Sequence, residues 1–375
     1  MAARPRDAVS ESPSGAAPPV VREVSAQDWD AFVLRFEDAI QEQLQDFNAA
    51  RRSDDKLRRL GVFRGDTPVG AALLRKVRVP VTGGAIYSTR WGPLWRPAGA
   101  DPAPDDPEAV YRALVDTVVR DEGAGLVFMP RPDPAFGEAD LAALDRLGFR
   151  AAPPLHNAAR YFVNVDLAPD AIRKSLSQKW RYNLKKALRE GLETGLVHGE
   201  EGRAEVLALY EEMVARKKFV DYSPIDTLAR RLAHPLDALR PRMFVTRKDG
   251  RAVAMAVVDV CGDTASFLYG ATSDAALPLR AGYALQWAVL EYLSAQPSIR
   301  WYGLGGGGDT ENCSLHQFKR GMTGKAGRTV PEPSPRYIGG RKCPTALVRV
   351  AVSSRDMRNR LREGLGAAFS LRLGG

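Results

Sequence analysis

The residues best suited to chemistry lie between Arg280 and Gly324. An apolar segment, residues 299–304, runs directly into four glycines at 305–308, and Lys319 follows shortly after them. Glycine lets backbone N–H groups approach a ligand closely, and a lysine supplies a positive charge. A strand that ends in a glycine-lined gap beside a cation is typical of a binding site. The pattern therefore predicts a site without naming its chemistry.

Several familiar sites are excluded by spacing. No Gly-Lys-Ser/Thr follows the glycine run, so it is not a Walker loop, and the spacing does not fit a dinucleotide-binding turn. No GxSxG is present, so a hydrolase nucleophile elbow is unsupported. The three cysteines lack CxxC spacing and the four histidines are scattered, so we expect no metal site. The alternative interpretation of this stretch is a mobile loop with a solvated lysine.

A second group of candidate residues lies on a basic segment. A long helix is predicted over residues 171–189, where Arg181, Lys185 and Lys186 lie close on one side. These cations suit an anionic acceptor or carrier. The alternative is a solvated basic face whose helix packs through its apolar residues.

Regular elements must position these residues. A helix that Pro297 ends is predicted before the strand at 299–304, and a second amphipathic turn carries Phe318 and Lys319. The first half of the chain predicts a helix after Ser25, a β-meander over 60–97, a helix through Val119, a strand at 126–129 and a helix at 141–147. The second half predicts a strand at 161–167, helices at 171–189, 205–216 and 226–239, a hairpin at 243–260 and a strand at 265–269.

The second half thus repeats the first in coarse order, which indicates a tandem duplication. We predict an α/β (α+β) fold of two similar domains, each a mixed, largely antiparallel sheet flanked by helices. The expected divisions are a disordered tail at 1–20, domains at 21–160 and 161–340, and a basic tail or helix at 341–375. That last segment is expected to pack on the body, with a peripheral membrane or nucleic-acid contact as the alternative.

The composition limits the choice of partners. The chain has 375 residues, 45% of them hydrophobic, and a formal net charge of +9, which makes an anionic partner plausible. No apolar run approaches the ~20 residues that span a bilayer, and the first residues lack the apolar region of a signal peptide. A cytoplasmic location is therefore expected. Oligomeric state is left open.

Two motifs make the chain similar to a known family. The first is KWRYNLKKALREGLETG at residues 179–195, and the second is Phe318-Lys319-Arg320-Gly321. Together they resemble the Fem family of aminoacyl transferases, tandem-GNAT enzymes that add amino acids from aminoacyl-tRNA to peptidoglycan precursors. The matching residues are Arg181, Asn183, Lys185, Lys186, Ala187, Gly191, Phe318, Lys319 and Gly321, and Trp91-Gly92-Pro93 and Tyr269 resemble further family positions. The resemblance covers roughly residues 25–330 and implies two tandem GNAT-like domains.

Two departures from the family concern the donor substrate. The helical hairpin that some Fem proteins insert in the second domain is missing from the pattern. The coenzyme A signature of GNAT enzymes is half present: Gly282 and Ala284 match its end, but Leu279 occupies the position of its cation and Arg280 comes one residue late. A standard acyl-CoA pyrophosphate site is therefore disfavoured.

The resemblance implies an N-acyltransferase that moves an activated aminoacyl or acyl group onto an amine. The expected acceptor is a cell-wall precursor peptide or a similar small molecule. The expected donor is aminoacyl-tRNA, with no tightly bound cofactor. One alternative is a transferase that uses acyl-CoA or an acyl carrier in envelope or secondary metabolism. The other is a non-catalytic RNA-binding module. Binding of uncharged tRNA without turnover would favour the module.

Roles for individual residues follow from this reaction, because an attacked carbonyl needs positioning and donors for its developing oxyanion. Lys319 is expected beside the donor's phosphate or the oxyanion, Phe318 in the acyl pocket, and Asp309 as a candidate base. The expected substrate-binding residues are Arg181, Asn183, Lys185, Tyr269, Gly305, Gly306, Gly307 and Trp301.

Overall fold

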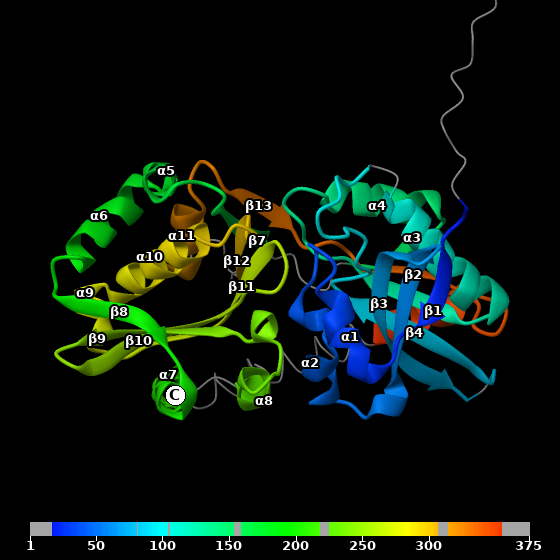
Figure 1. Ribbon diagram of the computed structural model, residues 1–375, viewed down its shortest axis with the longest axis horizontal. Coiled ribbons are helices and arrows are strands. Elements are labelled where there is room, and N and C mark those ends of the chain that lie inside the picture. Colours follow the sequence, from blue (N-terminus) through cyan, green and yellow to red (C-terminus); the bar gives the residue numbers. More distant parts are fainter. Residues whose placement is uncertain are drawn as a thin grey trace, which may run out of the picture.

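The protein consists of two α/β units, each built on one mixed sheet of seven strands. The computed structural model describes residues 17–80, 82–103, 106–153, 159–217, 225–306 and 314–354. The two units lie side by side in Figure 1. The predicted α+β fold with two similar units is confirmed. Most of the predicted tail at 1–20 lies outside the described residues.

The first sheet has the strand order β1-β2-β3-β4-β5-β14-β6. Only β4 and β5 run parallel among its described strands, and the others are antiparallel. The meander predicted over residues 60–97 is present as β2, β3 and β4. The strands are β1 (Val20–Glu23), β2 (Leu57–Arg64), β3 (Thr67–Val79), β4 (Gly84–Arg90), β5 (Gly125–Met129), β6 (Arg150–Ala151) and β14 (Arg336–Ile338).

The second sheet has the order β13-β7-β12-β11-β10-β9-β8, with β11 and β12 as its parallel pair. The hairpin predicted at Lys248-Asp249-Gly250 joins β9 to β10, and Asp249 and Gly250 take φ of 50° and 75° as a tight hairpin turn requires. The strands are β7 (Ala159–Asn164), β8 (Leu192–Val197), β9 (Arg242–Lys248), β10 (Arg251–Asp259), β11 (Thr264–Thr272), β12 (Trp301–Gly306) and β13 (Arg328–Pro331).

Helices cover both faces of each sheet, because the strands present apolar side chains on both faces. In the first unit α1 (Ala26–Val33) and α2 (Gln45–Ala49) pack on one face, and α3 (Asp106–Val115) and α4 (Gly137–Arg146) on the other. A π-helical turn, Asp116–Asp121, extends α3.

In the second unit α5, α6, α10 and α11 cover one face and α7 and α8 the other (Figure 1). No helix within the described ranges combines the length and apolar character needed to cross a membrane. The helices are α5 (Pro169–Ser175), α6 (Gln178–Ala187), α7 (Gly199–Lys217), α8 (Leu228–Leu232), α9 (Ala276–Leu279), α10 (Ala281–Ser294) and α11 (Ser314–Thr323).

Two predicted helices are wrong in extent. The single helix expected over residues 171–189 is broken into α5 and α6, because Ser177 has an extended backbone and caps α6 by accepting from the Trp180 backbone N–H. The helix expected over residues 226–239 contains only the short α8 and two single turns, since Pro235 lacks the N–H that would continue it.

The C-terminal segment crosses from the second unit to the first. β13 pairs with β7, but β14, which the predicted division assigns to the second domain, lies between β5 and β6 of the first sheet. Residues 345–354 are then helical, and Val348 packs with Ile86 and Val127 of that sheet. This packing concerns only the first part of the basic segment expected at 341–375, because residues 355–375 lie outside the described residues.

Candidate functional site

The parallel strands β11 and β12 separate part of the way along their length. They pair at Thr264–Trp301, Ala265–Tyr302 and Ser266–Gly303. Beyond that point β11 continues beside β10 as far as Thr272, and β12 continues beside β7 as far as Gly306. The facing edges of β11 and β12 therefore open into a wedge in which backbone groups can meet a ligand.

The corresponding parallel pair of the first unit stays closed. β4 and β5 pair at five consecutive positions, from Ile86–Gly125 to Arg90–Met129, which is the full length of β5. Only the second unit therefore offers an opening between its parallel strands within the described residues. This difference places the candidate site in the second unit.

A cavity of about 130 Å³ lies at the wedge and receives side chains from both units. Its walls are largely apolar, with two guanidinium groups and few other polar groups, as in a typical small-molecule site. The second unit contributes Arg160, Phe162, Thr264, Ser266, Phe267, Leu268, Tyr269, Gly303 and Gly305, and the first contributes Ile40, Gln41, Trp91, Arg131 and Pro132.

Two cations converge on the open space beside Gly305. Gly305 has φ of 73°, and the position that a Cβ would occupy lies 3.9 Å from Lys319 Nζ and 3.9 Å from Arg160 Nη1. Lys319 comes from α11 and Arg160 from β7. A carbonyl oxygen or an anionic oxygen beside Gly305 would lie near both positive charges.

Lys319 is held at this position by the end of β12. Its side chain is buried, and its ammonium donates a hydrogen bond to the Gly306 carbonyl oxygen. Burial makes a positive charge more effective toward a nearby oxygen because less water screens it. The predicted residues Lys319, Gly305 and Gly306 are thus brought together.

Arg160 is fixed on two sides. Its Nε and Nη2 lie 2.8 Å and 2.6 Å from Glu332 Oε2, and its guanidinium lies 5.3 Å from the ring centroid of Trp91. The remaining terminal nitrogen, Nη1, is the one nearest Gly305. The sequence prediction missed Arg160 and Glu332. The alternation of β7 could have found Arg160, because it shares a strand face with Phe162.

The other predicted residues differ in their position relative to the cavity. Tyr269 lines the cavity, and burial raises the pKa of its hydroxyl. Trp301 lies at the start of β12, paired with Asn164 and Thr264, and is not part of the cavity wall. Gly307 and Asp309 lie outside the described residues.

Phe318 does not line the cavity. Its ring centroid lies 4.9 Å from that of Tyr283 and 5.8 Å from that of Trp180, in an aromatic cluster among α6, α10 and α11. This contact packs α11 against its neighbours. Phe318 thereby supports Lys319, the next residue.

The α6 residues also lie away from the cavity wall. Arg181 donates to the Lys174 carbonyl oxygen at 2.7 Å, and Lys185 is exposed. Asn183 accepts from Arg280 Nε at 3.0 Å and donates to the Tyr283 hydroxyl at 3.3 Å. Asn183 therefore ties α6 to the beginning of α10.

The two sequence motifs pack directly against each other. The backbone N–H of Ser177, at the start of α6, donates to the Gly321 carbonyl oxygen of α11 at 2.9 Å. A Cβ on Gly321 would lie 2.8 Å from Ser177 Oγ, and one on Gly324 would lie 2.4 Å from the Ser175 carbonyl oxygen. Glycine is needed for this approach, which holds α11 and hence Lys319 in place.

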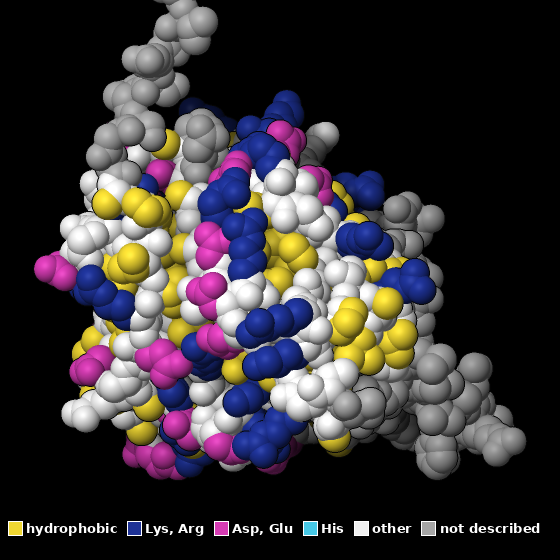
Figure 2. All heavy atoms as spheres, turned by 90° about the vertical axis from the view of Figure 1, so that its right-hand side faces the viewer, with side chains coloured by type: hydrophobic (Ala, Val, Ile, Leu, Met, Phe, Trp, Pro, Cys, Tyr) yellow, Lys and Arg dark blue, Asp and Glu magenta, His cyan; other side chains and the backbone are white. Residues whose placement is uncertain are grey.

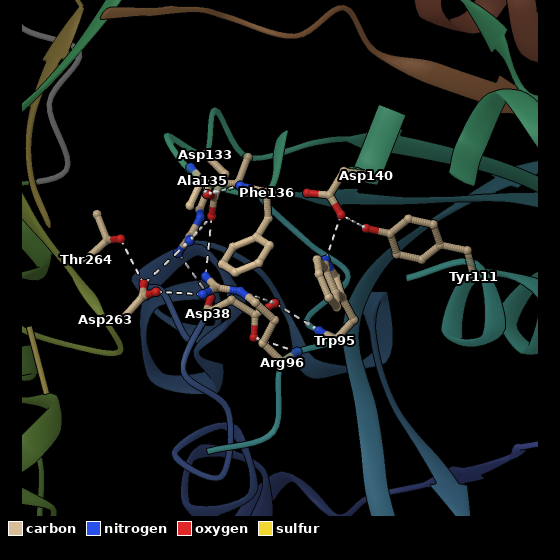
Figure 3. Close-up of polar contacts among 11 residues, drawn as sticks. Asp38, Trp95, Arg96, Tyr111, Asp133, Ala135, Phe136, Asp140, Asp263 and Thr264 are labelled. Carbon is tan, nitrogen blue, oxygen red and sulfur yellow. Dashed lines mark hydrogen bonds and ion pairs between the residues drawn. The ribbon is translucent and has the colours of Figure 1, made fainter. Parts of the chain in front are cut away.

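A buried ionic cluster supports the wall of the cavity where the two units meet (Figure 3). Arg131 lines the cavity and contacts Asp133, with Asp263 of the second unit 3.6 Å away. Arg96 bonds Asp263 at 2.6 Å and lies 3.3 Å from Asp133. Burial opposes ionisation of Asp133, but Arg131 and Arg96 outweigh it and lower its pKa to about 2.

Comparison with known proteins identifies the domain type. Residues 178–320 match the family model described as an acetyltransferase (GNAT) domain. This range includes the wedge, Lys319 and all of α6. A sequence comparison with curated proteins finds no match.

Solved structures share the whole two-unit fold. FemX aligns with a TM-score of 0.66 at 14% identity, over 84% of this chain and 96% of FemX. A protein of unknown function from Bacteroides thetaiotaomicron aligns with a TM-score of 0.56 at 13% identity, over 84% of this chain and 98% of that protein's chain. The C-terminal domain of a putative lysylphosphatidylglycerol synthetase from Agrobacterium fabrum aligns with a TM-score of 0.53 at 17% identity, over 87% of this chain and 96% of that domain's chain. Residues 178–320 of the second unit thus match a GNAT domain, and the whole chain shares the two-unit fold of FemX, as the resemblance to the Fem family implies.

Proposed function

We propose that the protein is an N-acyltransferase that moves an activated acyl group, first among candidates an aminoacyl group, onto an amine. The observation that carries this proposal is the convergence of Lys319 Nζ and Arg160 Nη1 on the open space beside Gly305. The donor chain would lie in the wedge between β11 and β12, with its carbonyl oxygen beside Gly305. The acceptor would enter from the side lined by the first unit.

The reaction needs little beyond positioning and charge. The amine nitrogen attacks the ester or thioester carbonyl carbon, a C–N bond forms, and the carbonyl oxygen becomes an oxyanion. The C–O or C–S bond of the donor then breaks, and the leaving oxygen or sulfur receives the proton that the amine gives up. Lys319 and Arg160 would stabilise the oxyanion, and removal of one such donor typically slows a reaction 10²–10³-fold.

For the donor, aminoacyl-tRNA follows from the Fem resemblance, and a cell-wall precursor peptide is the corresponding acceptor. Acyl-CoA is the second candidate. At the beginning of α10, Arg280 is already bound to Asn183 and to the Pro278 carbonyl oxygen at 3.1 Å. A pyrophosphate at this helix start would compete with those bonds, which supports the aminoacyl-tRNA donor over acyl-CoA.

The test is a donor screen by mass spectrometry with purified protein and cell-wall precursor extracts. One arm contains an aminoacyl-tRNA pool with and without RNase, and the other contains an acyl-CoA pool. A mass increment of an amino-acid residue that RNase abolishes would support the proposal. A mass increment seen only with acyl-CoA would support acyl transfer but would show that acyl-CoA, rather than aminoacyl-tRNA, is the donor.

Lys319→Ala is expected to lower kcat about 10²–10³-fold, since a buried cation beside the oxyanion is lost. Arg320→Ala is the matched control, because Arg320 is the exposed neighbour on the same helix. Steady-state kinetics with the donor found in the screen gives both values. Equal rates for Lys319→Ala and wild type would refute the site assignment.

A further inference from the structure

The face formed by α5 and α6 concentrates positive charge. Residues 169–190 contain seven Lys or Arg and two Asp or Glu, which gives a net charge of +5 against +9 for the whole chain. Within the described residues the α6 cations form no ion pair: Arg181 donates to the Lys174 carbonyl oxygen, and Lys186 lies over the ring of Tyr182. This segment lies at the outer edge of the second unit, away from the first (Figure 1).

The opposite face of the molecule is different. On the face of the first unit shown in Figure 2, Asp and Glu side chains lie beside some of the Lys and Arg side chains. Many of these charges are paired, as Arg22 is with Asp66 at 3.1 Å and Arg58 with Glu122 at 2.8 Å. The segment of α5 and α6 therefore differs from these paired charges, because its cations greatly outnumber its carboxylates.

Exposed apolar groups lie among these cations. On α6, Tyr182, Lys185 and Lys186 have the spacing of one helix face, opposite the buried Trp180, and Arg189 lies in the turn that follows the helix. Tyr182 is 56% exposed and Leu188, at the end of α6, is 51% exposed. Leu277 of α9 is 65% exposed, and its carbonyl oxygen accepts from the backbone of Arg280, which in turn bonds Asn183 of α6.

We propose that this surface, made of α5, α6 and Leu277, docks on a bilayer rich in anionic phospholipid. Basic residues around exposed leucines and an aromatic ring are the composition of an interfacial membrane contact. The cations would lie among the headgroups, and Leu188 and Leu277 would reach the acyl boundary. The surface is separate from the cavity, so this proposal does not depend on the proposed acyl transfer.

Nucleic acid is the competing partner for a basic face, and the apolar groups argue against it. The Lys186 ammonium lies 4.6 Å from the ring centroid of Tyr182, so one face of the only exposed aromatic ring on α6 is already covered. Base stacking would need that face. Two exposed leucines gain nothing from a phosphate backbone, whereas they gain from a lipid surface.

The test is co-sedimentation of the full-length protein with vesicles of phosphatidylcholine alone or of phosphatidylcholine mixed with phosphatidylglycerol. Binding is expected only to the mixed vesicles and should weaken as salt is raised. The double variant Lys186→Gln/Arg189→Gln should bind about 30-fold more weakly. The variant Leu188→Ser/Leu277→Ser should bind about tenfold more weakly, since less apolar area is buried.

Matched controls come from the first unit. Arg64→Gln/Arg78→Gln removes the same charge from exposed positions of β2 and β3, and Val77→Ser removes a side chain that is 58% exposed. Both should bind as wild type does. Equal binding to both vesicle types, no binding to the mixed vesicles, or unchanged binding of both α6 variants would overturn the proposal. So would competition by tRNA that depends on Lys186 and Arg189 but not on the leucines.

Discussion

At the scale of single residues, the arrangement around Gly305 explains why a glycine, a lysine and an arginine occur together. Any side chain at residue 305 would fill the space that Lys319 and Arg160 face, and its φ of 73° favours glycine as well. Lys319 is a compact charge fixed by a backbone carbonyl, whereas Arg160 is oriented by Glu332 and Trp91. Both cations are therefore held in place before a substrate arrives, which is how electrostatic stabilisation becomes large.

Arg160→Met should lower kcat about 10²-fold while leaving the fold intact, because the guanidinium is removed and the stem is kept. Glu332→Gln should have a smaller effect of the same sign, since the amide oxygen can still accept from Arg160 but the charge that holds it is lost. Steady-state kinetics on the two single variants and the double variant measures both effects.

If Glu332 acts through Arg160, its substitution should have little further effect in the Arg160→Met background. An additive loss in the double variant would show that Glu332 has a separate role. Glu23→Gln is the control, since Glu23 also pairs with an arginine, Arg58, but on the surface of the first unit.

At the scale of elements, the position of Lys319 depends on the contact between α6 and α11. Gly321 and Gly324 allow the start of α6 to approach α11 closely, and the rings of Trp180, Tyr283 and Phe318 fill the space between the helices. The two motifs that resemble the Fem family thus form one structural unit, although about 130 residues separate them in the sequence.

Gly324→Ala should destabilise the protein by about 2 kcal/mol or more. Its φ is 63°, which is strained for alanine, and the new Cβ would lie 2.4 Å from the Ser175 carbonyl oxygen. Gly137→Ala on α4 is the control, because its new Cβ would be no closer than 3.9 Å to any atom. Chemical denaturation followed by circular dichroism gives the free energies of unfolding. Equal stability of the two variants would mean that the α5–α11 contact carries no strain at Gly324.

Local patterns in the sequence predicted most of these elements but not their long-range partners. The hairpin at Asp249-Gly250, β12 and α11 follow from turn chemistry and periodicity over a few residues. The wedge between β11 and β12 is not visible this way, because the sequence does not show where two paired strands separate. The same is true of the pair between Arg160 and Glu332, which are 172 residues apart, and of β14, which has three residues and joins the other unit's sheet.

At the scale of the whole molecule, neither unit forms the cavity alone. The first unit supplies Trp91 and Arg131, and the second supplies the wedge and both cations. Their contact is fixed by buried groups: Gly262 approaches the Ala39 carbonyl oxygen so closely that a Cβ would lie 2.4 Å from it, and Arg96 bonds Asp263 across the boundary. The first unit therefore acts as part of the site as well as a support.

Buried carboxyl groups in the first unit make the stability of the protein depend on pH. Burial raises the pKa of Asp140 to about 7, although hydrogen bonds from Tyr111 and Trp95 oppose this rise. Burial also raises the pKa of Asp38 to about 6 against the opposing charges of Arg96 and Arg131. The folded protein therefore keeps protons that the unfolded chain releases near pH 4, so stability should fall as pH rises from about 4 to about 7.

Asp140→Asn isolates one of these groups. Both hydrogen bonds to Asp140 end on Oδ1, an acceptor that asparagine retains without the titrating charge. The melting temperature of the variant relative to wild type should therefore rise between pH 5 and pH 8, because only wild type must ionise the buried carboxyl of residue 140 over that range, whereas Asp38 titrates in both proteins. Differential scanning fluorimetry across this range measures the difference, with Asp66→Asn, a fully exposed carboxyl, as the control. A constant difference at every pH would show that Asp140 is ionised in the folded protein throughout and that its two hydrogen bonds outweigh the cost of burial.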